Sequence, residues 1–372
     1  MRILLTGGGT GGHVFPLLAV VQAVRRLAPE SEFFWFGSRR LEWDIASRYG
    51  IDGSFMPFTF SYRRMNLASA FYYLRTAPVW LSGKPVFTAC LSIDRFQPHI
   101  ILASGGYVSF PALIAAKVRS IPTCLVETNA VPGRINRIFS PFARRVYCAT
   151  ERIAGALRSR AAPASVLVTG YPARSAGVSD PFAYLGIERN NLPLVLIVGG
   201  SSGAEFLNEL MLRVAMTPGF ADEFGGRVTI IHQWGRAPEE REIGRFILLP
   251  HYHAVSFDPV IPDFYPHANL FVGRAGASTI AELAQAKLPA VLVPYPHHAD
   301  RQQYANASVL ADAGCALIRE EAELTPRSFI ELLRELVLEQ GAAKMRDGFG
   351  RIPTGGAEVI ARDILRLGGI GS

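Results

Sequence analysis

The sequence has few cysteines and no pattern among them that would bind a metal. The four, Cys90, Cys124, Cys148 and Cys315, stand far apart and form no CxxC pair. This spacing argues against a zinc site. It predicts unpaired thiols in a reducing compartment.

Long apolar segments are also absent. The chain has no run of about 18 apolar residues, so we expect no helix that crosses a membrane. The first apolar run ends at Gly7 and is too short for the core of a signal peptide, so none is expected. Low-complexity tracts are missing, and 49% of the residues are hydrophobic. A globular chain of 372 residues is therefore expected to form two domains.

Positive charge is concentrated in the first half of the chain. Residues 1–174 contain 21 lysines and arginines against 8 acidic residues, whereas the net charge of the whole chain is +7. A basic half indicates an anionic partner, which could be a nucleic acid, a membrane surface or a phosphorylated substrate. Charge alone does not distinguish these partners.

Short apolar strands alternate with helical patterns in both halves. The expected strands lie at 2–6, 32–36, 99–103, 123–127, 145–149, 192–200, 228–233, 269–273 and 290–294. Alternation of this kind predicts parallel sheets with crossover helices. We therefore expect an α/β protein with two doubly wound domains, which join near residues 170–172.

Four glycine-rich turns follow predicted strands. They lie at 7–13, 104–109, 199–204 and 273–278. A helix that begins after such a turn presents backbone N–H groups and partial positive charge, which suit a phosphate. Tight strand-to-helix packing would explain any one turn. Two turns in each half favour a ligand site beyond the carboxyl ends of both sheets.

The first turn also fits the G-x-G-x-x-G pattern of dinucleotide-binding domains, from Gly7 to Gly12. Such a site needs an acidic residue at the end of the second strand to bind the ribose. That strand runs into Arg39 and Arg40 instead, which would suit only the 2′-phosphate of NADP. We keep NADP binding as the weaker hypothesis.

Eight motifs occur in order between residues 3 and 318. They are GGTGGHVFP (8–16), SGGYVSFPALIAA (104–116), ETNAVPGRIN (127–136), GYPAR (170–174), GGSSGAEFLN (199–208), HQWGR (232–236), GRAGASTIAELA (273–284) and DRQQYANA (300–307). Together they resemble the MurG family of peptidoglycan glycosyltransferases. That family transfers N-acetylglucosamine from UDP-N-acetylglucosamine to undecaprenyl-diphospho-N-acetylmuramoyl-pentapeptide (lipid I), which gives lipid II.

The resemblance implies the GT-B fold, in which two Rossmann-like doubly wound parallel-sheet domains face each other across a cleft. Residues 1–172 would form the acceptor- and membrane-facing domain, on which a C-terminal helix of about residues 356–372 could pack. Residues 173–355 would form the UDP-sugar donor domain.

On the acceptor side, the resemblance assigns the lipid diphosphate to the backbone amides of Thr10, Gly11 and Gly12. His13 would then be the base, or position the base, that deprotonates the attacking sugar hydroxyl, because an imidazole titrates near neutral pH. A lone histidine at a helix start would instead be a packing residue, but the preceding GGTGG favours the functional role. The other acceptor-side contacts that the resemblance implies are Tyr107, Glu127 and Asn129.

On the donor side, the resemblance assigns Glu282 to the ribose of UDP, because a carboxylate can accept both ribose hydroxyls. The remaining donor residues that it implies are Arg174, Ser201, Ala277, Ser278, Thr279, Gln302 and Gln303. The serine and the helix-start amides would face the diphosphate, the glutamines the hexose, and the arginine the departing UDP. A structural role stays open for one glutamine, and a surface ion pair for the arginine.

Three stretches depart from the family pattern. Residues 126–129 read VETN where the family has HEQN, Tyr171 replaces the Asn of GNPVR, and GRAGA replaces CRSGA. These departures lie near both substrate sites and leave the acceptor open.

No two aspartates are separated by one residue, so the DxD metal signature of other glycosyltransferases is missing. We therefore expect no metal and no other cofactor. Helix ends and Arg174 would stabilise the leaving group. The expected outcome is inversion by a single displacement.

Residues 53–93 contain no aspartate or glutamate, and segment 60–87 mixes aromatic with basic residues. This composition suits the surface of an anionic bilayer, and equally a helix packed on the sheet. A lipid-linked acceptor favours a peripheral protein on the cytoplasmic face of the inner (cell) membrane.

Two alternatives remain. The chain could be a GT-B relative with another lipid or small-molecule acceptor, which the altered HEQN stretch keeps open. It could also be a non-catalytic UDP-sugar-binding protein, against which His13, Glu282 and the two glutamines argue. Binding to nucleic acid is not expected, because no recognised module is present and a lipid diphosphate with a membrane accounts for the basic half.

Overall fold

The computed structural model describes residues 1–39, 41–56, 83–160, 162, 165–175, 177–200, 203–297 and 301–369. The chain forms two compact units. One comprises Met1–Arg174 with Pro353–Ser372, and the other comprises Ser175–Ile352. Most of segment 60–87, predicted above as a membrane contact, lies outside the described residues.

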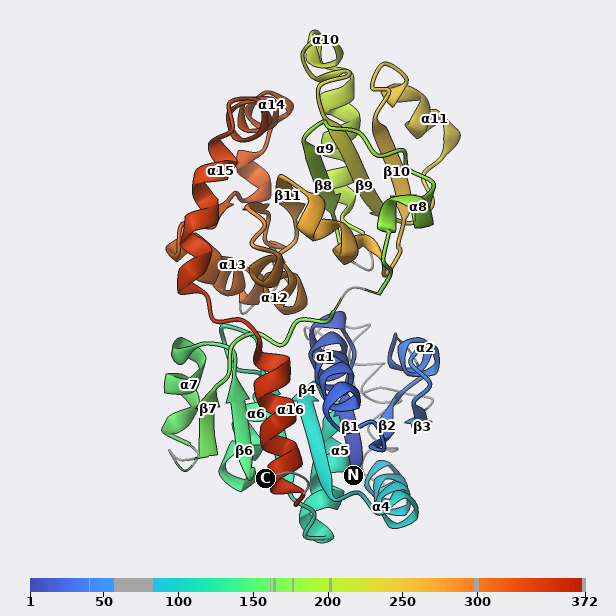
Figure 1. The fold of residues 1–372 in the computed structure, drawn as a ribbon, viewed down its shortest axis with the longest axis vertical. Coiled ribbons are helices and arrows are strands. Elements are labelled where there is room, and N and C mark those ends of the chain that lie inside the picture. The colour runs from blue at the N-terminus through green and yellow to red at the C-terminus, as the bar shows by residue number, and fades with distance from the viewer. Residues whose placement is uncertain are drawn as a thin grey trace, which may run out of the picture. The chain divides into compact units, whose positions relative to one another are not determined.

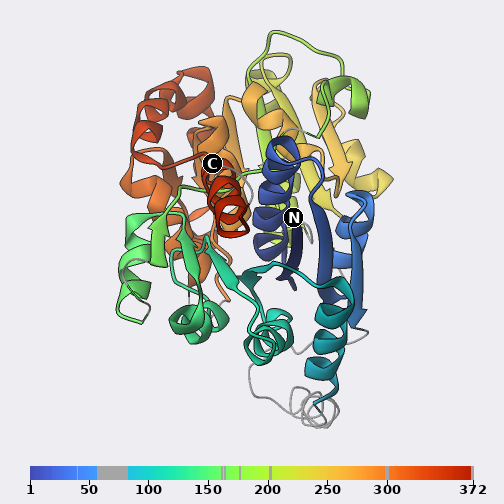
Figure 2. The same cartoon turned by 60° about the horizontal axis from the view of Figure 1, so that its bottom comes forward.

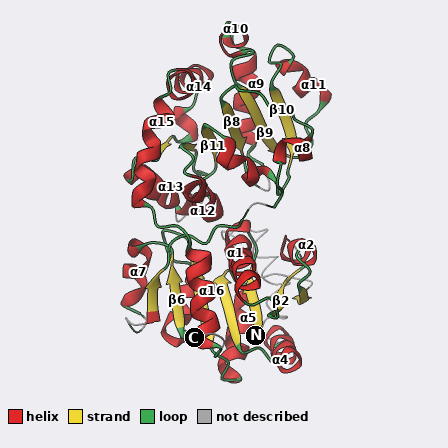
Figure 3. Cartoon of the chain, in the orientation of Figure 1, coloured by secondary structure: helices red, strands yellow, loops and turns green. Residues whose placement is uncertain are grey.

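The first unit contains a sheet of seven parallel strands in the order β3-β2-β1-β4-β5-β6-β7 (Figures 1 and 3). Its strands are β1 (Arg2–Gly7), β2 (Glu32–Ser38), β3 (Asp52–Met56), β4 (Ile100–Gly105), β5 (Thr123–Glu127), β6 (Arg145–Cys148) and β7 (Val166–Val168). The strand order reverses between β1 and β4. In such sheets, ligands bind at the carboxyl ends of the strands that flank the reversal.

Helices cover both faces of this sheet. They are α1 (Gly11–Leu27), α2 (Leu41–Arg48), α4 (Lys84–Phe96), α5 (Ser109–Val118), α6 (Arg134–Phe139), α7 (Glu151–Arg158) and α16 (Gly356–Leu367), and the 3₁₀ turn η1 (Ser140–Phe142) follows α6. Side chains of β1 alternate between the faces. Ile3 and Leu5 pack into the cluster shared with α1 and α16, and Leu4 into the cluster shared with α4 and α5.

The C-terminal helix α16 belongs to the first unit and runs beside α1 (Figures 1 and 2). Its Ile360, Ala361 and Ile364 are fully buried in the core that α1 lines. Asp363 anchors the helix to β6. Its Oδ2 accepts hydrogen bonds from the Tyr147 hydroxyl at 2.8 Å and from Arg145 Nε at 3.1 Å.

Replacing Asp363 should weaken this anchor. Hydrogen bonds to a charged group contribute about 1.5–3 kcal/mol, and this carboxylate is largely buried, so Asp363→Ala should lower the free energy of unfolding by about 2 kcal/mol. Glu358→Ala is the control, because the side chain of this partly exposed residue on the same helix forms surface ion pairs. Urea unfolding measures both variants, and equal small losses would contradict the assignment.

The second unit has a sheet of six parallel strands in the order β10-β9-β8-β11-β12-β13. Its strands are β8 (Leu194–Val198), β9 (Thr229–Gly235), β10 (Tyr252–Ser256), β11 (Leu270–Gly273), β12 (Ala290–Leu292) and β13 (Ala316–Ile318). Its α-helices are α8 (Pro181–Leu185), α9 (Glu205–Ala215), α10 (Phe220–Phe224), α11 (Glu240–Ile243), α12 (Ala277–Ala286), α13 (Gln302–Asp312), α14 (Pro326–Leu333) and α15 (Gly341–Met345). The order reverses between β8 and β11, so the turns after these two strands lie at the corresponding ligand position.

The structure confirms the predicted fold class, since both units are doubly wound parallel α/β sheets. Within the described ranges, no helix has the length and apolar character needed to cross a bilayer. Cys124, Cys148 and Cys315 are buried free thiols, and Cys90 is half-buried.

Candidate active site

The glycine turns that follow β1 and β4 touch through their backbones. A Cβ on Gly106 would lie 2.5 Å from the Gly8 carbonyl oxygen, and Gly106 has a φ of +77°. A Cβ on Gly7 would lie 2.1 Å from Ser104 Oγ. Gly106 must therefore be glycine both for its positive φ and for the close backbone approach, and Gly7 must be glycine for space. The two turns must meet where the strand order reverses, and this explains why glycines occur in both of them.

His13 lies where these two turns meet, as the third residue of α1. Its Nδ1 is 2.8 Å from the carbonyl oxygen of Ser104. A carbonyl only accepts hydrogen bonds, so in the neutral imidazole Nδ1 carries the proton and Nε2 keeps its lone pair. The Ser104 hydroxyl also donates to the His13 carbonyl oxygen, which fixes the position of the residue from a second side.

Burial lowers the pKa of His13, and the hydrogen bond to Ser104 opposes this shift. The half-buried imidazole is therefore neutral at neutral pH, with Nε2 able to accept a proton. A group in this state can act as a general base.

The start of α1, beside His13, has the features that an anion site requires. The first helical hydrogen bonds leave the N–H groups of the opening turn outside the ladder. Thr10 is the N-cap residue, and in the described structure its side chain makes no capping hydrogen bond to these amides. The N–H groups of Gly11 and Gly12 are thus available to a phosphate, as predicted for an acceptor diphosphate.

Glu127 holds the loop after β5. Its Oε1 accepts from Asn129 N at 2.9 Å and Asn129 Nδ2 at 3.2 Å, and its Oε2 from Gly133 N at 2.7 Å and Asn136 Nδ2 at 3.0 Å. Burial raises the pKa of Glu127, and these hydrogen bonds oppose the shift. Both carboxylate oxygens serve the loop itself. Direct contact of Glu127 or Asn129 with an acceptor stays a prediction.

Two further predicted residues lie in the first unit. Tyr107 is half-buried in the turn after β4. The Arg174 guanidinium is 6.0 Å from the ring centroid of Phe15, which lies in the first turns of α1. The structure therefore brings Arg174 to the helix that carries His13, and its positive charge adds to that of the helix start.

The departures from the family pattern are buried. Val126 packs in the core beneath the loop, and Thr128 is 4% exposed. Tyr171 is fully buried, and its backbone bonds to Pro353 and Gly356 where the chain re-enters the first unit. These side chains therefore lie inside the first unit and not on its surface.

In the second unit, α12 begins directly after the turn that follows β11. The hydrogen bond from Ile280 N to Gly276 O, 3.0 Å long, opens the helical ladder. The amides of Ala277, Ser278 and Thr279 precede it and lie at the positively charged helix end. Glu282 is half-buried one and a half turns further along the same helix.

The two glutamines open α13 and differ in their contacts. Gln303 Oε1 accepts a hydrogen bond from Tyr295 N at 2.9 Å, which ties it to the chain that follows β12. This contact is the structural role that the sequence left open for one of the pair. Gln302 is half-buried at the first position of the helix. The predicted Ser201 lies outside the described residues.

The sequence did not identify Arg274 as part of this site. Its guanidinium is largely buried, donates to Val293 O at 3.1 Å and pairs with Glu321 at the start of the 3₁₀ turn η5 (Glu321–Glu323). It therefore joins three segments, the turn before α12, the chain after β12 and the chain after β13. The sequence feature that could have identified Arg274 is its position directly after a buried strand.

Gln233 similarly ties β9 to the turn after β8, through Nε2 and Gly200 O at 3.3 Å. The turns of the second unit are thus held by buried polar side chains from neighbouring strands.

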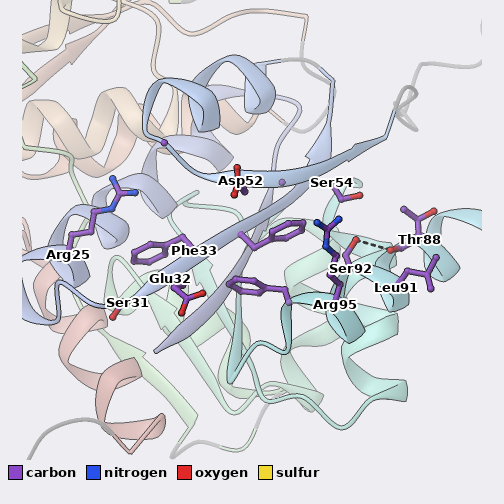
Figure 4. A pocket seen from close by; sticks show the side chains of 14 residues that line it. Arg25, Ser31, Glu32, Phe33, Asp52, Ser54, Thr88, Leu91, Ser92 and Arg95 are labelled. Atoms are coloured by element: carbon purple, nitrogen blue, oxygen red, sulfur yellow. Dashed lines mark hydrogen bonds between the residues drawn. The ribbon is translucent and has the colours of Figure 1, made fainter.

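A separate pocket of about 900 Å³ lies at the opposite end of the first sheet (Figure 4). It is lined by Arg25 of α1, by Phe33 and Asp52 near the amino ends of β2 and β3, by Ser92 and Arg95 of α4, and by residues near them. None of the predicted site residues is among them. In the parts of the chain that the structure describes, no three His, Cys, Asp or Glu side chains are grouped to hold a metal ion.

Two family models match the chain. The glycosyltransferase family 28 N-terminal domain matches residues 3–148, and the family 28 C-terminal domain matches residues 194–350. These ranges contain all strands of the two sheets except β7, and they carry the paired glycine turns.

Curated relatives match most of the chain. The UDP-N-acetylglucosamine–N-acetylmuramyl-(pentapeptide) pyrophosphoryl-undecaprenol N-acetylglucosamine transferase of Actinobacillus pleuropneumoniae (serotype 5b) is 34% identical, over 91% of this chain and 90% of its own. The enzyme of the same name from Shewanella loihica is 33% identical, over 92% of this chain and 89% of its own.

Among solved structures, MurG of Acinetobacter baumannii matches with a TM-score of 0.70 and 24% identity, over 98% of this chain and 99% of that one. This likeness supports the GT-B fold. The chain therefore belongs to the family of UDP-N-acetylglucosamine–N-acetylmuramyl-(pentapeptide) pyrophosphoryl-undecaprenol N-acetylglucosamine transferases and is a family 28 glycosyltransferase.

Proposed function

We propose that the enzyme transfers N-acetylglucosamine from UDP-N-acetylglucosamine to O4 of the muramoyl residue of undecaprenyl-diphospho-N-acetylmuramoyl-pentapeptide, which converts lipid I to lipid II. The observation that carries this proposal is His13, whose Nδ1 is fixed by Ser104 directly after the glycine turn. His13 would provide a proton acceptor, and the neighbouring start of α1 would provide an anion site. Transfer to a diphosphate-linked sugar requires both.

In the proposed reaction, His13 Nε2 takes the proton from the muramoyl O4 hydroxyl as that oxygen attacks C1 of N-acetylglucosamine. The bond between C1 and the β-phosphate oxygen breaks, and UDP leaves with the electron pair. A single displacement turns the α-linkage of the donor into a β-linkage. The Nδ1 bond to Ser104 holds the tautomer that keeps Nε2 unprotonated.

The donor would bind the second unit through α12. Its helix-start amides would face the UDP diphosphate, and Glu282 would accept the ribose hydroxyls. Gln302 and the Nε2 group of Gln303 would bind the hexose. Arg274 supports this role, because it holds the turn before α12 in place.

We expect the reaction to proceed without a metal or other cofactor. The charge that develops on the departing UDP would be stabilised by the positive end of α12 and by the guanidinium of Arg174.

We place the enzyme on the cytoplasmic face of the inner membrane as a peripheral protein. The described surface of the first unit supports a contact with an anionic bilayer. Val118, Ile138 and Phe142 are exposed on α5, α6 and η1, and Lys117 Nζ lies 3.6 Å from the Phe142 ring centroid. Apolar and basic groups side by side suit a bilayer surface.

The test is transfer of labelled N-acetylglucosamine from its UDP donor to a lipid I analogue, with unlabelled UDP-glucose and UDP-galactose as competitors and EDTA in a parallel reaction. We expect labelled product that requires the muramoyl acceptor, persists in EDTA and resists both competitors. UDP binding without transfer would favour the alternative of another acceptor, and label on a different lipid would replace the proposal.

The pH dependence of kcat/KM should follow His13. Because burial lowers its pKa below the ordinary value of 6.5, the base stays neutral in mildly acidic solution. Activity should therefore fall only as the pH drops through this lowered value, and the acid limb should have its midpoint below 6.5. A pH series with a fixed lipid I analogue measures this, and a midpoint above 7 would contradict the assignment.

A further inference from the structure

Glu42 is a buried carboxylate pressed against the first glycine turn. It is the second residue of α2 and has no exposed surface. Its Oε1 accepts hydrogen bonds from Gly9 N at 2.8 Å and from Ser38 Oγ at 3.0 Å. None of the roles proposed above uses this side chain, although it touches the turn that precedes His13.

The contact leaves no room for another side chain in the turn. A Cβ on Gly8 would lie 1.6 Å from Glu42 Oε1, so the carboxylate occupies the space that only a glycine leaves open. The requirement for glycine at this position therefore comes from Glu42, and the phosphate explanation is not needed there.

The other carboxylate oxygen has no partner. Glu42 Oε2 is buried and makes no hydrogen bond in the described structure. Burying a polar oxygen without a hydrogen bond is unfavourable, so a residue that served only to fill this space would be better apolar. Two features make the carboxylate acceptable here, the positive end of α2 and the two donors on Oε1.

Gly9 shows what the carboxylate does for the turn. Its φ is +86° and the residue is exposed, and the hydrogen bond from its N–H to Glu42 fixes its orientation. Exposed glycine backbones are conformationally free, so a turn of this composition needs an external anchor to hold one shape. Glu42 is such an anchor, and Ser38 at the end of β2 fixes the anchor itself.

We propose that Glu42 is a positioning residue for acceptor binding. Through Gly9 it holds the turn so that the N–H groups of Gly11 and Gly12, at the start of α1, face the diphosphate of the acceptor. The proposal rests on the proposed function for the identity of the acceptor, but the effect on the turn does not depend on it. Glu42 itself does not touch the substrate.

The test compares two substitutions of similar volume. Glu42→Met removes both acceptor oxygens, and Glu42→Gln keeps an oxygen for Gly9. We expect Glu42→Met to raise the KM for a lipid I analogue by about tenfold or more, because a charged hydrogen bond is lost, with the KM for UDP-N-acetylglucosamine within about twofold. In Glu42→Gln, the acceptor KM should stay within about threefold of that of the unmodified enzyme.

Asp263→Leu is the matched control for general destabilisation. Asp263 Oδ2 also holds two backbone amides, Gly177 N at 2.9 Å and Val178 N at 3.0 Å, but in the second unit. The Asp263→Leu variant should leave the acceptor KM unchanged. If Glu42→Met does not fold, Glu42→Asp replaces it, because the shorter side chain withdraws the oxygen from Gly9.

Two readouts do not need transfer activity. Amide hydrogen exchange at Gly9 should be protected in the unmodified enzyme and in Glu42→Gln, and at least about tenfold faster in Glu42→Met. Inorganic pyrophosphate should bind the unmodified enzyme more tightly than Glu42→Met. Unchanged exchange, or equal losses of acceptor and donor affinity, would overturn the role of Glu42. A lack of transfer by the unmodified enzyme would overturn only the proposed function.

Discussion

The His13→Ala variant is expected to lose transfer by a factor of about 10²–10⁴, the usual contribution of a positioned general base. Binding of UDP-N-acetylglucosamine should be unchanged within about twofold, because the proposed donor contacts lie on α12 and α13. The cause is specific. Ser104 holds Nδ1 at 2.8 Å, so only Nε2 can take the proton, and alanine leaves no acceptor there.

Single-turnover transfer and a separate UDP-binding titration measure the two effects. His99→Ala is the control, because this exposed histidine lies at the other end of the same sheet and its Nδ1 accepts only a backbone bond from Arg2. Transfer by His13→Ala at near the unmodified rate would remove His13 from the mechanism. Loss of UDP binding would show that the variant is damaged more widely.

The second large effect is expected at Glu282. A carboxylate that accepts ribose hydroxyls contributes about 1.5–3 kcal/mol per hydrogen bond, so Glu282→Ala should raise the KM for UDP-N-acetylglucosamine by about 10- to 100-fold. The KM for the acceptor should stay within about twofold. The residue lies on the helix whose first amides would bind the diphosphate, so ribose and phosphates would be bound by one rigid element.

Glu209→Ala is the matched control, because this glutamate is exposed on α9 of the same unit. Titration with UDP and with uracil-containing fragments that lack the ribose hydroxyls separates the ribose contact from the rest. If Glu282→Ala distinguished UDP from its 2′,3′-dideoxy analogue as strongly as the unmodified enzyme does and kept normal donor affinity, the ribose assignment would be wrong.

The central strands of both sheets could be predicted, and the four edge strands could not. β3, β7, β10 and β13 are the strands that the sequence did not indicate, and each lies at the edge of its sheet. A central strand is buried on both faces and forms a continuous apolar run. An edge strand is partly solvated, and β3 reads DGSFM, which differs little from a loop.

The positions of His13 and the glycine turns could also be predicted, because the strand–turn–helix pattern is local. The roles of Ser104, Glu42 and Arg274 could not be predicted. Each acts through a contact that joins segments distant in the chain, as with Glu42 and Gly9 or Arg274 and Glu321. The sequence could not show that the oxygens of Glu127 hold the loop after β5, and its contact with the acceptor stays a prediction.

Two residues that depart from the family pattern, Val126 and Tyr171, bear on the choice of acceptor. Val126 and Tyr171 are both buried, so they change the packing behind the loop and add no group to its surface. Asn136 joins Val126 to Glu127, since its Nδ2 donates to Val126 O at 3.0 Å and to Glu127 Oε2 at 3.0 Å. This arrangement favours retention of the family's acceptor.

The structure of the product tests the account most directly. The unmodified enzyme would be incubated with UDP-N-acetylglucosamine carrying ¹³C at C1 and a lipid I analogue, and the product examined by NMR. We expect the product to carry one new sugar in β-linkage to O4 of the muramoyl residue, with UDP released. An α-linkage, attachment at another position, or no product despite UDP binding would contradict it.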